Sequence, residues 1–170
     1  MSKLWASIDP AKRVTGVALW EGDRLEGTFT IKPRGASGKW YTEDGKVMES
    51  EYMAFDYGLT GLHAVIMEEG FGGFAKAVAT QGERRGYIRA VCAVNKTPCQ
   101  TVNVSEWRRC IKEAYGVSWP RESARCKALS VKLVREIHGR DVGDDEADAV
   151  LIGAAAMRMR LVDWAESRWR

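Results

Sequence analysis

Short apolar runs separated by turn residues organise the first part of the chain. Residues 4–8, 15–20 and 24–31 are three such runs, and Asp-Pro and Glu-Gly-Asp sequences divide them. Because closely spaced runs of this length are typical of hairpins, the pattern predicts an antiparallel meander of three strands. Residues 32–46 contain Gly, Pro and Ser and are predicted to form a loop, with a small hairpin turning at Asp44-Gly45.

The rest of the chain alternates between strand and helix patterns. The predicted strands are 63–67 and 101–104. The first two predicted helices are a short one at 50–57 and a long one from about 73 to 94. A third helix at 106–115 is capped by Ser105, and a fourth is introduced by Pro120 and stopped by Gly139. The last helix begins at about Asp145. Three hairpin strands followed by strands alternating with helices predict an α/β fold, with a five-stranded mixed sheet flanked by helices.

Composition sets broad limits on the protein class. The chain has 170 residues, of which 45% are hydrophobic and 29% charged, and its net charge is +3. These values indicate one globular domain spanning 1–170, without a membrane-spanning run or a secretory signal. Four cysteines without a CxxC spacing are expected to be reduced thiols, which favours a cytoplasmic location.

Acidic residues at element boundaries are the chemical signal in the sequence. Asp9 ends the first predicted strand, Glu68-Glu69 end the fourth, and Asp145 and Asp148 lie three residues apart at the start of the last helix. Residues at that spacing share a helix face, so the two aspartates can point at one ion. Carboxylates from three separate elements would repel one another without a cation between them, which predicts a divalent-metal site.

Each acid also has an ordinary structural interpretation. Asp9 suits an Asp-Pro turn, Glu68 and Glu69 suit a strand end, and the acids from Asp144 onward suit a helix N-terminus. Asp148 is different because it lies one turn into the helix, on the side that continues through apolar residues. A buried carboxylate needs a partner, and a cation is the simplest one.

A competing motif is present and is rejected. Residues 70–75 (GFGGFA) fit a dinucleotide-binding fingerprint that follows a strand and opens a helix. However, Glu68-Glu69 would face the pyrophosphate, and no acid follows about 20 residues later to bind a ribose hydroxyl. No nucleotide cofactor is therefore expected. The two histidines, His63 and His138, are not placed for a nucleophilic triad.

Four segments in the same order resemble the RuvC-type Holliday-junction resolvases of bacteria and their phages. They are IDPAKRVTG at 8–16, IMEEGF at 66–71, QGERRG at 81–86 and DEADA at 145–149. The resemblance implies a ribonuclease H-like fold and a homodimeric, Mg²⁺-dependent endodeoxyribonuclease, in a bacterial or phage-infected cell, that cuts branched DNA such as four-way junctions. Ala11-Lys12 and residues 32–50 depart from the family's pattern, which leaves its substrate preference open.

The resemblance also implies roles for individual residues. Two Mg²⁺ ions per active site, for which Mn²⁺ would substitute, would be held by Asp9, Glu68, Asp145 and Asp148, with Lys127 as the catalytic lysine. Phe71 matches an aromatic inserted at the junction, and the helix carrying Gly82 and Gly86 would form the dimer interface. The residues expected to contact DNA are Lys12, Arg13, Phe71, Phe74, Lys76, Arg84, Arg85, Arg108, Arg109, Lys112 and Arg125.

Other functions remain open from the sequence. A related nuclease could act on another branched DNA or on structured RNA. An actin-like or sugar-kinase-like ATP-binding protein has the same sheet and a strand-end aspartate, although those proteins need two such domains. A non-catalytic DNA-binding relative is disfavoured, because unused acids would only repel phosphate.

Overall fold

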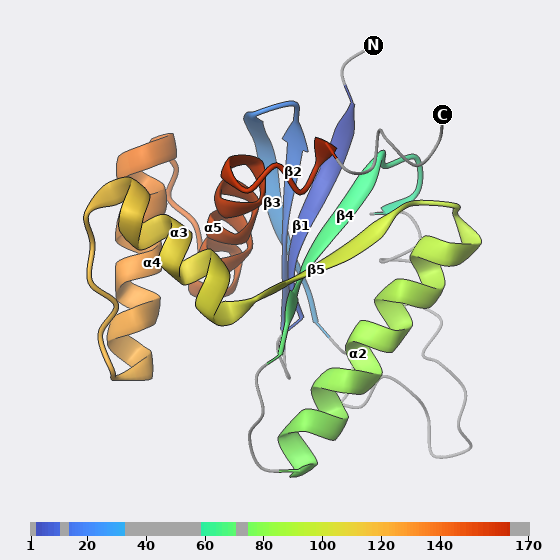
Figure 1. The fold of residues 1–170 in the computed structure, drawn as a ribbon, viewed down its shortest axis with the longest axis horizontal. Helices are drawn as coiled ribbons and strands as arrows, with labels where there is room; N and C mark the ends of the chain where they lie inside the picture. Colours follow the sequence, from blue (N-terminus) through green and yellow to red (C-terminus); the bar gives the residue numbers. More distant parts are fainter. Residues whose placement is uncertain (1–2, 11–13, 33–58, 71–74, 164–170) are drawn as a thin grey trace.

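A five-stranded mixed sheet forms the centre of the molecule and has helices on both faces (Figure 1). The computed structural model describes residues 3–10, 14–32, 59–70 and 75–163. The elements in chain order are β1 (Leu4–Pro10), β2 (Thr15–Glu21), β3 (Arg24–Ile31), β4 (Ala64–Glu69), α2 (Ala75–Val94), β5 (Cys99–Asn103), α3 (Val104–Tyr115), α4 (Ser123–His138) and α5 (Asp144–Arg158).

The strand order is β3-β2-β1-β4-β5. Strand β2 pairs antiparallel with both β1 and β3, whereas β4 pairs parallel with both β1 and β5. This arrangement confirms the predicted mixed sheet, in which three hairpin strands are followed by parallel strands. It also places the ends of β1, β4 and β5 at the same end of the sheet.

Side chains that alternate between the two faces of the sheet divide the hydrophobic core into two clusters. On one face Ala6 and Ile8 of β1 pack with residues of α2 such as Ile88 and Val91. On the other face Trp5 packs with residues of α3, α4 and α5. Because successive side chains in a strand point to opposite faces, Ser7 and Asp9 lie on the same face as Trp5.

Helix α5 is buried on all sides. It packs against β1, β2, β3 and β4, while α3 and α4 cover its outer surface (Figure 1). From Ala147 to Ala156 every residue except Asp148 is buried. A helix that is apolar around its whole circumference is stable only when it is enclosed in this way, so Asp148 is a carboxylate held within an otherwise apolar helix.

Several predicted boundaries needed correction. The cap of α3 is Asn103, whose side chain accepts a hydrogen bond from the backbone N–H of Ser105, so Ser105 is not the N-cap. Helix α4 begins at Ser123 rather than at Pro120, and its end at Gly139 agrees with the prediction. The predicted turn at Asp44-Gly45 and the helix at 50–57 lie outside the described residues.

Two further findings concern the thiols and the hydropathy of the helices. All four cysteines are free thiols. In the part of the chain that the structure describes, no helix combines the length and hydropathy needed to cross a bilayer.

A buried polar network fixes α5 to the sheet. The Ser7 hydroxyl donates to the Ala149 carbonyl oxygen at 2.7 Å and accepts from the Trp20 indole N–H at 2.8 Å. Gly153 makes room for it, because a Cβ atom there would lie 2.4 Å from Trp20 Nε1 and 2.6 Å from Ser7 Oγ. Through these contacts β1, β2 and α5 hold one another in register.

Replacing Ser7 with alanine tests this network. Ser7→Ala would leave the buried Trp20 N–H without its acceptor, and we expect a loss of about 1–3 kcal/mol in the free energy of unfolding. Urea denaturation would measure the loss. Ser118→Ala, at an exposed position, is the control and should change stability by less than about 0.5 kcal/mol. Equal midpoints for the two variants would contradict the role given to Ser7.

Candidate active site

The acidic residues singled out by the sequence come from elements that meet at one end of the sheet. Asp9 pairs with Gly16 near the end of β1, and Glu68 pairs with Val102 near the ends of β4 and β5. Helix α5 begins beside Gly16, so its first turn lies against this same end. The chain therefore brings strand ends and a helix start to one place.

Gly16 allows the close approach of α5. A Cβ atom at this position would lie 2.0 Å from the Asp145 carbonyl oxygen and 2.6 Å from its carbonyl carbon. Real Cβ atoms do not approach backbone so closely, so a side chain here would force the helix away from β2. The absence of a side chain at Gly16 thus sets the distance between Asp145 and β2, the strand that pairs with β1, where Asp9 lies.

Asp9 is the electrostatic centre of the cluster. Burial raises the pKa of Asp9 well above its ordinary value, and the negative charges of Glu68, Asp148 and Asp145 raise that pKa further. Lys127 acts in the opposite direction. All four carboxylates and the lysine therefore lie near enough to interact.

Glu68 is held by an indole. Trp107, in the first turn of α3, donates from Nε1 to Glu68 Oε2 at 2.9 Å. Burial raises the pKa of Glu68, and the Trp107 hydrogen bond partly offsets that rise. Glu69 is exposed and, by strand alternation, lies on the opposite face, so only Glu68 of this pair lies with the other acids.

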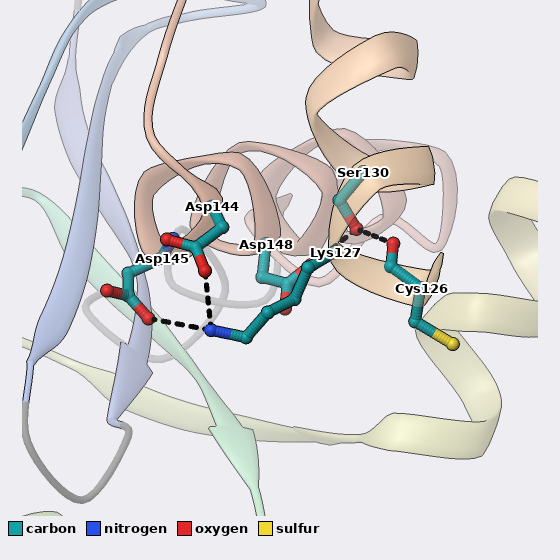
Figure 2. Close-up of polar contacts among 6 residues, drawn as sticks. All are labelled: Cys126, Lys127, Ser130, Asp144, Asp145 and Asp148. Atoms are coloured by element: carbon teal, nitrogen blue, oxygen red, sulfur yellow. Dashed lines mark hydrogen bonds and ion pairs between the residues drawn. The ribbon is translucent and has the colours of Figure 1, made fainter. Parts of the chain in front are cut away.

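Asp148 is held by α4. The Ser130 hydroxyl lies 2.5 Å from Asp148 Oδ1 and also contacts the Cys126 carbonyl oxygen at 3.2 Å (Figure 2). Burial raises the pKa of Asp148, while the Ser130 hydrogen bond lowers it. The expectation that Asp148 points inward agrees with this placement.

Lys127 reaches from α4 to the start of α5. Its Nζ atom lies 2.6 Å from Asp144 Oδ2 and 3.6 Å from Asp145 Oδ1, and Asp148 lies beside it (Figure 2). The hydrogen bond to Asp144 raises the pKa of Lys127, and the same bond lowers the pKa of Asp144. Asp144, which the sequence assigned only to a helix N-terminus, is therefore the direct partner of the lysine.

The donor set fits a hard divalent cation. Among the described residues, no three acidic, histidine or cysteine side chains are already arranged to enclose an ion. The charges of the other three acids nevertheless raise the pKa of Asp9, and the charge of Asp148 raises the pKa of Glu68. A bound divalent cation would relieve this repulsion. Oxygen-only ligands of this kind suit Mg²⁺.

Two of the residues predicted to contact DNA act on the acids through their charge. Arg108 lowers the pKa of both Glu68 and Asp148, and Arg85 of α2 lowers that of Glu68. Arg109, Lys112 and Arg125 are exposed on α3 and α4.

The remaining predicted contacts are placed differently. Arg84, which the sequence predicts as a DNA contact, is 2% exposed and lies inside the molecule. Lys12, Arg13, Phe71 and Phe74 lie outside the described residues, as does the side chain of Lys76.

Sequence reasoning missed Trp107 and Ser130 as partners of the acids. Ser130 follows Lys127 by three residues and shares its helix face, so the spacing offered a signal. No local pattern could have linked Trp107 to Glu68, because the two are 39 residues apart and meet only through the pairing of β4 with β5.

Comparisons with known proteins identify the fold. The chain resembles Thermus thermophilus RuvC in complex with Holliday junction substrate, with a TM-score of 0.64, 16% identity, and coverage of 92% of this chain and 96% of that one. A second Thermus thermophilus RuvC structure gives a TM-score of 0.58 at 17% identity and the same coverage. No protein-family model matches the sequence, and no curated protein matches it. The predicted RuvC-type, ribonuclease H-like fold is confirmed.

Two strand glycines provide a test of the site's construction. Gly16→Ala should displace the first turn of α5 from β2, lowering stability by about 1–3 kcal/mol through overpacking. Gly27→Ala on β3 is the matched control, because no atom of the described part of the chain lies within 4 Å of a Cβ there. Thermal denaturation and the ¹H–¹⁵N chemical shift of Asp145 would be measured for both. A Gly16→Ala protein with an unshifted Asp145 signal would show that the helix start is not restrained by this contact.

Proposed function

We propose that this protein is a structure-selective endonuclease that cuts branched DNA, including four-way junctions, by divalent-metal-dependent phosphodiester hydrolysis. The observation that carries the proposal is the convergence of Asp9, Glu68, Asp145 and Asp148 at one end of a RuvC-type sheet. Thermus thermophilus RuvC, whose structure this chain resembles, was solved in complex with a Holliday junction substrate, which supports branched DNA as the substrate.

The four carboxylates would hold the metal, and Mg²⁺ is the ion that their oxygen donors favour. The chemistry that a pair of such ions would supply there is activation of a water nucleophile and charge balance on the leaving oxygen. The protein's own part is to hold the ligands in place: Trp107 restrains Glu68, Ser130 restrains Asp148, and Gly16 sets the position of Asp145.

Lys127 supplies a positive charge at the edge of the acidic cluster. Its ammonium group is partly exposed and is held by Asp144, so it is available to a phosphate while remaining charged. In this position it would stabilise negative charge that develops on the phosphate during cleavage. Arg85 and Arg108 would bind the backbone of the same strand, because both guanidinium groups lie close enough to influence Glu68.

Asp145→Asn tests the proposed chemistry. Removing one carboxylate charge should abolish cleavage of a labelled four-way junction in Mg²⁺, a loss of at least about 100-fold, while junction binding is retained or strengthened because a repulsive charge is lost. Asp141→Asn is the control, since Asp141 is an exposed residue paired with Arg135 on the surface.

The substrate class is settled in the same assay. Four-way junction, replication fork, linear duplex and RNA hairpin are compared with and without Mg²⁺. Preferential cutting of the RNA hairpin would favour the related ribonuclease H-like nuclease instead. Undiminished cleavage by Asp145→Asn would remove Asp145 from the site.

We further propose that the active form is a homodimer. A four-way junction has near-twofold symmetry, and two symmetric nicks require a pair of sites related by the same symmetry. Among the described residues, none comes within 4 Å of a Cβ atom placed at Gly82 or Gly86 of α2, and both glycines are exposed. This surface of α2 is therefore open to a second copy, as the resemblance implies.

Gly86→Arg tests the proposed interface. A long charged side chain on this face should convert a micromolar dimer into a monomer in sedimentation velocity experiments, with loss of paired nicking. Ala128→Arg introduces the same side chain at an exposed position of α4 and should leave the dimer intact. A wild-type protein that sediments as a monomer while resolving junctions fully would contradict the proposal.

A further inference from the structure

The first turn of α3 carries an aromatic group whose polar atom is directed at the acidic site. Trp107 is fully buried, and its only polar side-chain atom, Nε1, donates to Glu68 Oε2 at 2.9 Å. An indole N–H cannot accept a hydrogen bond or coordinate a cation. Its effect on Glu68 is therefore confined to fixing the carboxylate's orientation and stabilising its negative charge.

Trp107 is itself held in place by a cluster formed with Arg108 and Trp119. The Trp107 and Trp119 rings meet edge to face, with centroids 5.3 Å apart and an interplanar angle of 85°. The guanidinium carbon of Arg108 lies 5.2 Å from the Trp107 centroid and 5.1 Å from the Trp119 centroid. The Trp119 indole donates to the Arg108 carbonyl oxygen at 2.8 Å, which ties the segment before α4 to α3.

The N-terminal cap of α3 fixes the position of Trp107 relative to Glu68. Asn103, which pairs with Glu69 at the end of the sheet, accepts from Ser105, while the Glu106 carboxylate accepts from the Asn103 backbone N–H. This reciprocal cap sets the direction in which the helix leaves β5. Trp107 follows one residue later, so its position is determined by the same sheet that carries Glu68.

We propose that Trp107 is a positioning residue that orients Glu68 for metal binding, and that the Trp107–Arg108–Trp119 cluster holds it in that role. The inference rests on the proposed function and deepens it. Outer hydrogen-bond partners of metal ligands affect affinity because they restrict the ligand to the productive orientation before the ion arrives. Arg108 adds a fixed positive charge that favours the ionised forms of Glu68 and Asp148.

Trp107→Phe separates orientation from packing, because phenylalanine keeps an aromatic ring beside Trp119 and Arg108 but lacks the N–H donor. Calorimetric titration of the DNA-free protein with Mg²⁺ should show about 10-fold weaker binding or more, as for other lost partners of metal ligands. In cleavage assays kcat at fixed Mg²⁺ should fall while KM for the junction is unchanged. A purely structural role would instead lower stability without changing the ion's affinity in the folded protein.

Trp5→Phe is the matched control. It also removes a buried indole N–H, but that donor serves the Gly22 backbone carbonyl, and Trp5 is not part of the Trp107–Arg108–Trp119 cluster, so Mg²⁺ affinity should stay near the wild-type value. Wild-type affinity in a folded Trp107→Phe protein would overturn the inference while leaving the proposed function intact. A wild-type protein that binds no divalent cation and cuts no DNA would overturn both.

A second measurement does not need Trp107→Phe and applies even if that variant does not fold. Comparison of ¹H–¹⁵N spectra of the wild-type protein and Glu68→Gln identifies the indole N–H signal of Trp107 as the one that the substitution displaces. Titration of the wild-type protein with Mg²⁺ should displace the same signal, because both changes alter the charge on the acceptor of that hydrogen bond. If Mg²⁺ binds and that indole signal does not move, Glu68 is not oriented through Trp107.

Discussion

The burial of α5 is the constraint on which the rest of the structure depends. The helix lies between the sheet and the α3–α4 layer, and the hydrogen bonds from Trp20 to Ser7 and from Ser7 to Ala149 lock it to β1 and β2. Because the helix cannot slide or turn without breaking these contacts, the two aspartates in its first turns have fixed positions. The acidic cluster is therefore built by apolar packing, and its geometry follows from how closely β2 lets the helix approach.

This packing places like charges together, which is unfavourable on its own. Asp9, Glu68 and Asp148 all have raised pKa values, with burial as the largest cause. The protein offsets part of the cost with fixed donors and cations: an indole for Glu68, a hydroxyl for Asp148, and Lys127 and Arg108 around them. Clusters of buried acids with perturbed pKa values are typical of functional sites. Each stabilising partner comes from an element other than the one carrying the acid.

The layer formed by α3 and α4 has two tasks that share the same residues. It covers the outer surface of α5, completing the core, and it supplies the groups that restrain the acids. Trp107 shows this double use, since its ring is part of the hydrophobic cluster while its N–H reaches Glu68. Ser130 is likewise buried within α4 and contacts Asp148. Stability and site geometry are thus coupled, so changes in this layer affect both.

The sequence by itself determined the sheet and the identity of the acids. Short apolar runs with turn residues specified the β1–β2–β3 meander, and the strand-end and helix-start positions of Asp9, Glu68, Asp145 and Asp148 marked them as a group, because these signals are local. Tertiary structure alone decided which partners restrain those acids, that Arg84 is buried, and that Gly16 sets the approach of α5. Those features depend on contacts between segments far apart in the chain, and the pairing of strands and the packing of helices create them; no pattern of neighbouring residues encodes them.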